Sequence, residues 1–145
     1  MNVFTYGTLM DPEIMHRVSG GQFQALKASL KNFSRKRVHG EVYPGIIKQE
    51  DCSVEGIVYL DVDPFALARL DLFEGSQYAR REVLLGSTSG AELQAQTYVI
   101  KAEHGVELTG EDWNFEDFLK TGKAVFFEQY PGFEELGQLS EECQG

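Results

Sequence analysis

Apolar residues at helical spacing predict a helix over residues 63–75. Asp63-Pro64 opens the segment, apolar positions recur every three or four residues up to Phe73, and Gly75 follows. Aspartate caps free backbone N–H groups, proline suits the first helical position, and glycine accepts the conformation just past a helix end. Asp11-Pro12 opens a similar apolar pattern that stops at Gly20, and it predicts a second helix.

Segments rich in β-branched and aromatic residues predict about six strands. They are residues 2–6, 25–30, 53–60, 81–85 and 93–100, together with a bent pair at 38–43 and 44–47 that is counted as one. Between them, residues 31–37 are strongly basic and are interpreted as a solvated hairpin. A short capped helix is expected at 114–120, ended by Gly122, with Trp113, Phe115 and Phe118 packed onto the sheet. Strands and helices in this order predict an α+β fold with a curved or barrel-like sheet.

Composition adds limits to this picture. The chain has 145 residues and a net charge of −10, which suits a single domain and argues against binding a phosphate backbone. No apolar run approaches the length needed to cross a bilayer, and no signal-peptide pattern is present, so we expect a cytoplasmic protein without membrane partners. Cys52 and Cys143 are then expected to be free thiols. Residues 1–133 form the expected domain, and 134–145 an acidic, mobile tail.

Glu74 is the candidate functional group. It falls at the predicted end of the helix over 63–75, where the helix dipole disfavours a carboxylate and raises its pKa. Asp71 lies one turn earlier on nearly the same face and is its nearest competitor. The alternative for Glu74 is an ordinary solvated surface carboxylate.

The turn Gly7-Thr8-Leu9-Met10 links a predicted strand to a predicted helix. Its backbone N–H groups could hold an anion or a developing oxyanion. Alternatively, Gly7 only relieves strain in a tight turn. The three histidines have no metal-ligand spacing with either cysteine, and no phosphate loop or serine nucleophile motif is present. Cys52 could be a nucleophile, but no neighbour in the sequence activates it.

Several short motifs occur together in one order. They are VFTYGTLM at 3–10, YPGI at 43–46, VEGIVY at 54–59, LDLFEG at 70–75 followed by Tyr78 and Arg80, and AQTYV at 95–99. This ordered set resembles the γ-glutamylcyclotransferase-like superfamily, in its AIG2-like branch. The later segment 113–118 is similar to an extension in plant members of that branch.

The resemblance implies a barrel around a central cavity and an activity. Members cut γ-glutamyl amides by intramolecular attack, which gives 5-oxoproline and a free amine, and they need neither a metal nor an organic cofactor. The acid/base glutamate of the family corresponds to Glu74. The residues that the resemblance places at the substrate are Tyr6, Gly7, Thr8, Leu9, Pro44, Gly45, Tyr78 and Tyr98. The expected partner is thus a small γ-glutamyl compound, and the oligomeric state stays open.

Two alternatives to this activity remain. One is a non-catalytic small-molecule-binding or stress-related module on the same fold. The other is an enzyme that removes a γ-glutamyl group from a larger metabolite.

Overall fold

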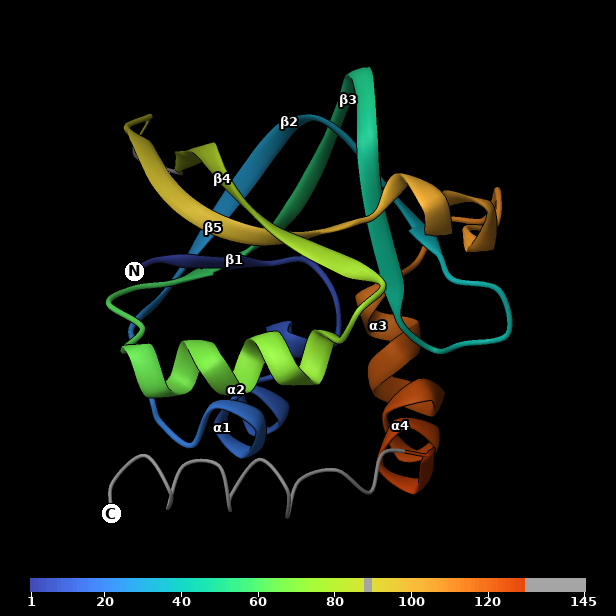
Figure 1. The fold of residues 1–145 in the computed structure, drawn as a ribbon, viewed down its shortest axis with the longest axis horizontal. Coiled ribbons are helices and arrows are strands. Elements are labelled where there is room, and N and C mark those ends of the chain that lie inside the picture. Colours follow the sequence, from blue (N-terminus) through green and yellow to red (C-terminus); the bar gives the residue numbers. More distant parts are fainter. Residues whose placement is uncertain (88–89, 130–145) are drawn as a thin grey trace.

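Five strands close into a barrel in the computed structural model, which describes residues 1–87 and 90–129 (Figure 1). They are β1 (Val3–Thr5), β2 (Ala25–Arg37), β3 (Pro44–Tyr59), β4 (Tyr78–Ser87) and β5 (Glu92–Ile100). Their order around the barrel is β1-β3-β2-β4-β5. β1 pairs antiparallel with β3 and parallel with β5, and the other neighbouring pairs are antiparallel. The predicted α+β fold with a small barrel is confirmed.

The long β2–β3 hairpin differs from the predicted short strands. The basic residues at 31–37 belong to this hairpin, as expected, but they continue β2 as a paired strand, with Phe33 opposite Lys48 and Arg37 opposite Pro44. The separate strand predicted at 38–43 is wrong, because those residues form the turn between β2 and β3, with one bridge from Val38 to Leu108. The strands predicted at 44–47 and 53–60 are parts of the single strand β3.

The two aspartate–proline pairs begin helices where predicted. α1 (Pro12–Ser19) is capped by Asp11, whose side chain accepts a hydrogen bond of 2.9 Å from the backbone N–H of Glu13. α2 (Pro64–Glu74) is capped in the same way by Asp63, at 2.8 Å from the N–H of Ala66. The two helices lie against each other on one side of the barrel (Figure 1).

The C-terminal helical segment is longer than predicted. After the 3₁₀ helix η2 (Ala102–Glu107), the chain forms α3 (Phe115–Asp117), a π-helical turn η3 (Phe118–Gly122) and α4 (Lys123–Gln129). The prediction that Gly122 ends the helix is wrong, because η3 continues directly into α4 and Gly122 does not have the positive φ of a helix-ending glycine. The glycine allows close packing, since a Cβ atom at Gly122 would lie 2.9 Å from the Phe118 ring.

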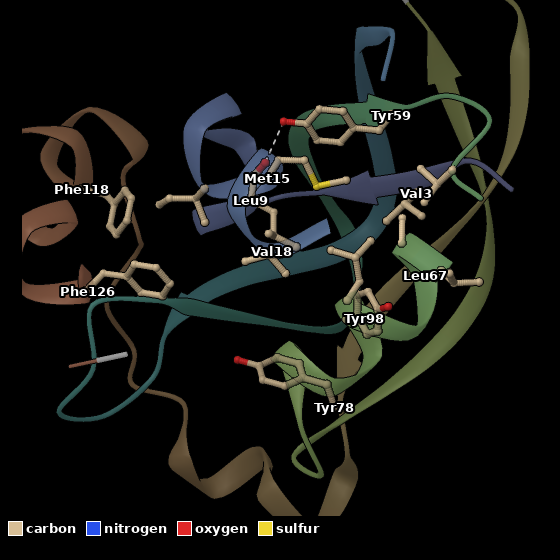
Figure 2. Close-up of a cluster of buried hydrophobic side chains, with 14 of the residues drawn as sticks. Val3, Leu9, Met15, Val18, Tyr59, Leu67, Tyr78, Tyr98, Phe118 and Phe126 are labelled. Carbon is tan, nitrogen blue, oxygen red and sulfur yellow. Dashed lines mark hydrogen bonds between the residues drawn. The ribbon is translucent and has the colours of Figure 1, made fainter. Parts of the chain in front are cut away.

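Two hydrophobic clusters form the core. One lies inside the barrel and includes Phe4, Leu30 and Ile46. The other lies between the barrel and the helices, and Figure 2 shows side chains from α1, α2 and the C-terminal segment meeting in it. Trp113 and Phe118 are buried in this second cluster and Phe115 packs against it. Because the cluster includes the strand residues Val3, Tyr59 and Ile100, the predicted packing of these aromatic residues onto the sheet is confirmed.

The remaining predictions concern the cysteines, the tail and the membrane. Cys52 is a partly buried free thiol in β3. Cys143 and the predicted tail at 134–145 lie outside the described residues. Among the described helices, none combines the length and the apolar composition that a membrane crossing requires.

Candidate functional site

A cavity of about 190 Å³ lies between one end of the barrel and helix α2. Loops, strands and helices that are far apart in the sequence all contribute to its wall. The lining residues are Phe4, Thr5, Tyr6, Gly7, Thr8, Leu9, Tyr43, Pro44, Phe73, Glu74, Gln77, Tyr78, Tyr98 and Phe126. Half of these are aromatic, and Glu74 is the single carboxyl residue among them, so the cavity offers one acid/base group within an apolar enclosure.

The turn after β1 forms one wall. Thr8–Met10 is a 3₁₀ turn, in which the N–H of Met10 donates to the carbonyl of Gly7 at 3.0 Å. Glycine is required at position 7 because a Cβ atom there would lie 2.8 Å from the Pro44 ring. The Tyr59 hydroxyl of β3 donates a hydrogen bond of 2.8 Å to the Leu9 carbonyl and so holds the turn against the barrel (Figure 2).

Glu74, the last residue of α2, also lines the cavity. The cavity leaves its side chain partly accessible, yet protein surrounds the carboxyl group closely. Burial, together with the negative charge of Asp71, raises the pKa of Glu74 to about 8. The sequence predicted a raised pKa from the helix end. The structure instead attributes the rise first to loss of water and then to a neighbouring carboxylate.

Asp71 does not share the cavity with Glu74. Its Oδ1 atom accepts a 2.6 Å hydrogen bond from the Tyr98 hydroxyl and lies 3.1 Å from Nε of Arg80. Its side chain is 42% exposed. The nearest competitor for the acid/base role is thus paired with a cation outside the cavity, and it acts on Glu74 through its charge.

Three tyrosines complete the polar part of the wall. The hydroxyl of Tyr6 donates to the carbonyl of Tyr98 at 2.5 Å, and that of Tyr78 donates to the carbonyl of Pro44 at 2.9 Å. Burial raises the pKa of Tyr6, Tyr78 and Tyr98 well above the ordinary tyrosine value. Their hydroxyls therefore stay protonated at neutral pH and act as fixed hydrogen-bond donors.

The structure brings together most of the residues singled out from the sequence. Tyr6, Gly7, Thr8, Leu9, Pro44, Glu74, Tyr78 and Tyr98 all line the cavity. Gly45 does not, because its α-carbon faces the side chains of Leu108 and Ile100.

Sequence reasoning missed several other lining residues. Phe73 was recognised only as an apolar helix position, and Tyr43 only as part of a turn motif. Gln77 follows the helix without a pattern of its own. Phe126 lies beyond the glycine that was expected to end the last helix. A continued aromatic pattern, with Phe118 followed by Phe126 and Phe127, was the available signal for that helix.

Metal binding and cationic groups were also considered. Within residues 1–87 and 90–129, no cluster of three or more histidine, cysteine or carboxylate side chains is placed to hold a metal ion. No lysine, arginine or histidine of those residues lines the cavity. Negative groups of a ligand would therefore have to be bound by backbone N–H groups, by hydroxyls or by the side-chain amide of Gln77.

Comparisons with known proteins agree with this geometry. The family model for gamma-glutamyl cyclotransferase, AIG2-like, matches residues 3–115. AIG2-like protein C of Arabidopsis thaliana is 34% identical over 142 residues, which cover 97% of this chain and 81% of that protein.

Solved structures show the same fold. The solution structure of an Arabidopsis thaliana protein has a TM-score of 0.69 and 30% identity, covering 92% of this chain and 90% of that one. A yeast gamma-glutamyl cyclotransferase specific to glutathione shares the fold. Its TM-score is 0.61, and the two chains are 12% identical over 98% of this chain and 96% of that one. The chain therefore belongs to the AIG2-like gamma-glutamyl cyclotransferase family.

Proposed function

We propose that this protein cleaves γ-glutamyl amides by intramolecular cyclisation, giving 5-oxoproline and a free amine. The observation that carries the proposal is Glu74, the single carboxyl among the described residues of the cavity wall, with a pKa raised to about 8. Membership of the AIG2-like gamma-glutamyl cyclotransferase family supports it.

The reaction needs one group that moves a proton twice. The substrate α-amine attacks its own γ-carbonyl carbon, a new C–N bond closes the five-membered ring, and the original amide C–N bond breaks. Starting from the α-ammonium, the attacking nitrogen loses two protons and the leaving nitrogen gains two, so no water is consumed. Glu74 takes each proton from the attacking nitrogen and gives it to the leaving amine. Positioned proton transfer of this kind contributes roughly 10²–10⁴-fold to a rate.

The raised pKa suits this role. An α-ammonium group has a pKa of about 8, so proton transfer from it to a carboxylate with a pKa of about 8 is close to thermoneutral. An ordinary glutamate would make the same transfer unfavourable by about 5 kcal/mol, since each pKa unit corresponds to 1.36 kcal/mol. The apolar enclosure that raises the pKa of Glu74 therefore also lowers the cost of the first step.

The turn at residues 7–10 supplies donors for the negative groups. The N–H groups of Thr8 and Leu9 precede the first hydrogen bond of the 3₁₀ turn, which Met10 makes to Gly7, so they have no acceptor within it. In the proposed complex they bind the α-carboxylate or the oxyanion of the γ-carbonyl. The aromatic wall holds the substrate in a folded conformation, which reduces the entropy lost on ring closure.

The experiment is turnover of a panel of γ-glutamyl amides, with 5-oxoproline and amine measured together. The wild-type protein should release both from at least one compound, and Glu74→Gln should reduce the rate at least about 100-fold. Asp71→Asn is the matched control, because it removes a carboxylate from the same helix but outside the cavity, and it should reduce the rate less. Binding without turnover across the whole panel would favour the non-catalytic module. Release of free glutamate instead of 5-oxoproline would favour removal of the γ-glutamyl group by hydrolysis.

A further inference from the structure

Helix α4 contributes one residue to the cavity from outside the region that the family model matches. The match ends at residue 115, whereas Phe126 lies in α4 (Lys123–Gln129) and lines the cavity. Phe126 is only 5% exposed. Figure 2 shows Phe118 and Phe126 projecting from the C-terminal helices toward the residues of the barrel and of α1 and α2. The wall of the cavity is therefore completed by a part of the chain beyond the matched region.

Phe126 meets the cavity beside Glu74. Its ring packs edge-on against Phe73, with the ring centroids 5.9 Å apart, and Phe73 directly precedes Glu74 at the end of α2. Both phenylalanines line the same cavity as the carboxyl. A group that receives a proton from Glu74 must therefore carry its substituent close to an aromatic surface built by α2 and α4.

An ion pair holds α4 in this position. Nζ of Lys123 lies 2.6 Å from Oδ2 of Asp11 and 3.0 Å from Oε2 of Glu13. The Asp11 side chain is only 5% exposed, so it is a buried carboxylate that requires the ammonium as its partner. Asp11 also caps α1 and directly follows the turn at residues 7–10 that lines the cavity. The ion pair thus connects the walls formed by that turn and by Phe126.

From this arrangement we propose that Phe126 determines specificity for the leaving amine, and that it selects amines bearing an aryl or large alkyl group. This inference rests on the proposed cyclisation activity. Moving an apolar substituent of the amine from water onto the surface of Phe73 and Phe126 makes the binding free energy more favourable. Lys123 is a positioning residue, which acts by holding α4 against Asp11.

The test compares two substrates that differ only in the leaving amine: γ-glutamyl phenethylamide and γ-glutamyl methylamide. The measured quantity is the ratio of their kcat/KM values for 5-oxoproline formation. The wild-type ratio should favour phenethylamide by about 10-fold or more, and Phe126→Ala should reduce the ratio about 10-fold, as expected for a lost apolar pocket contact. Val125→Ala is the matched control, since Val125 is on the same helix but does not line the cavity, and it should leave the ratio unchanged.

Two further variants separate specificity from folding. Phe126→Leu keeps an apolar side chain and should fold even where the alanine variant does not, while still lowering the preference for the aromatic amine. Lys123→Met should lower the same ratio. Lys123→Arg should keep the ratio near the wild-type value, because arginine retains the positive charge. A general loss of structure would reduce both substrates equally and leave the ratio constant.

The outcomes distinguish the proposed cyclisation activity from the proposed role of Phe126 in specificity. Equal ratios in the wild-type protein, Phe126→Ala and Phe126→Leu, with 5-oxoproline still formed, would overturn the specificity role and leave the activity intact. A wild-type protein that forms no 5-oxoproline from these compounds or from the wider panel would overturn both.

Discussion

Removing the Glu74 carboxyl should change how the stability of the protein depends on pH. The pKa of this group is about 8 in the folded protein, against 4.5 for an ordinary glutamate. Below about pH 4.5 the group is protonated whether the chain is folded or unfolded, so it costs nothing. Between about pH 4.5 and pH 8 the unfolded chain ionises this group, whereas the folded state keeps it protonated because a buried negative charge is costly. Above about pH 8 the folded state ionises as well, and the difference between the two states stops growing. Stability is therefore lost between about pH 4.5 and pH 8.

The size of this loss follows from the difference between the two pKa values. About 3.5 pKa units correspond to about 5 kcal/mol at 1.36 kcal/mol per unit. Glu74→Gln keeps the size of the side chain and cannot ionise, so it should lack this loss. The difference in free energy of unfolding between the variant and the wild-type protein should rise toward that value from about pH 4.5 to pH 8, by on the order of 1.4 kcal/mol per pH unit, and should then level off.

Urea unfolding measured at several pH values provides the assay. Trp113, the one tryptophan of the chain, is buried, so its fluorescence reports the loss of the core. Glu50→Gln, which removes one exposed carboxyl from β3, controls for the change in net charge. A difference between Glu74→Gln and the wild-type protein that stays constant from pH 5 to pH 9 would refute the argument that burial raises the pKa of Glu74.

Three other predictions concern activity and the cavity wall. The value of kcat/KM should rise with pH up to about 8 and fall above it, because the reaction needs one proton shared between Glu74 and the substrate amine; a plateau already reached near pH 6 would contradict this. Gly7→Ala should lower the free energy of unfolding by about 1–3 kcal/mol, as overpacking does, since the new Cβ atom would lie 2.8 Å from Pro44; thermal unfolding measures this, and an unchanged Tm would contradict it. Cys52→Ser should retain full activity, because Cys52 does not line the cavity; loss of turnover in a folded variant would restore the nucleophile alternative.

Elements with strong local signals were predictable from the sequence. Asp11 and Asp63 cap α1 and α2 as their position before proline indicated. Glu74 falls at the end of α2 because Gly75, with a φ of 79°, follows it. These features depend on a few neighbouring residues, so the sequence alone contains the information.

Features that depend on tertiary contacts were not predictable in the same way. The basic residues of β2 remain in a strand because their backbone pairs with residues 44–48 of β3, and because Arg37 also exchanges backbone hydrogen bonds with Glu111 and Thr109. Gly122 does not end its helix, because α4 follows directly and buries Phe126 in the core against residues of the barrel and of the other helices. Phe126 lines the cavity because the ion pair between Lys123 and Asp11 holds α4 in place. The residues around Lys123 in the sequence do not indicate that its partner is Asp11.

Mass analysis of the products formed in water enriched in ¹⁸O tests the central claim most directly. If Glu74 promotes attack of the substrate amine on its own γ-carbonyl, no water enters the reaction. A turned-over γ-glutamyl amide should then give 5-oxoproline without ¹⁸O, in an amount equal to the amine released, and Glu74→Gln should form little of it. Glutamate that carries one ¹⁸O atom in its γ-carboxyl group would show attack by water and would contradict the proposed cyclisation.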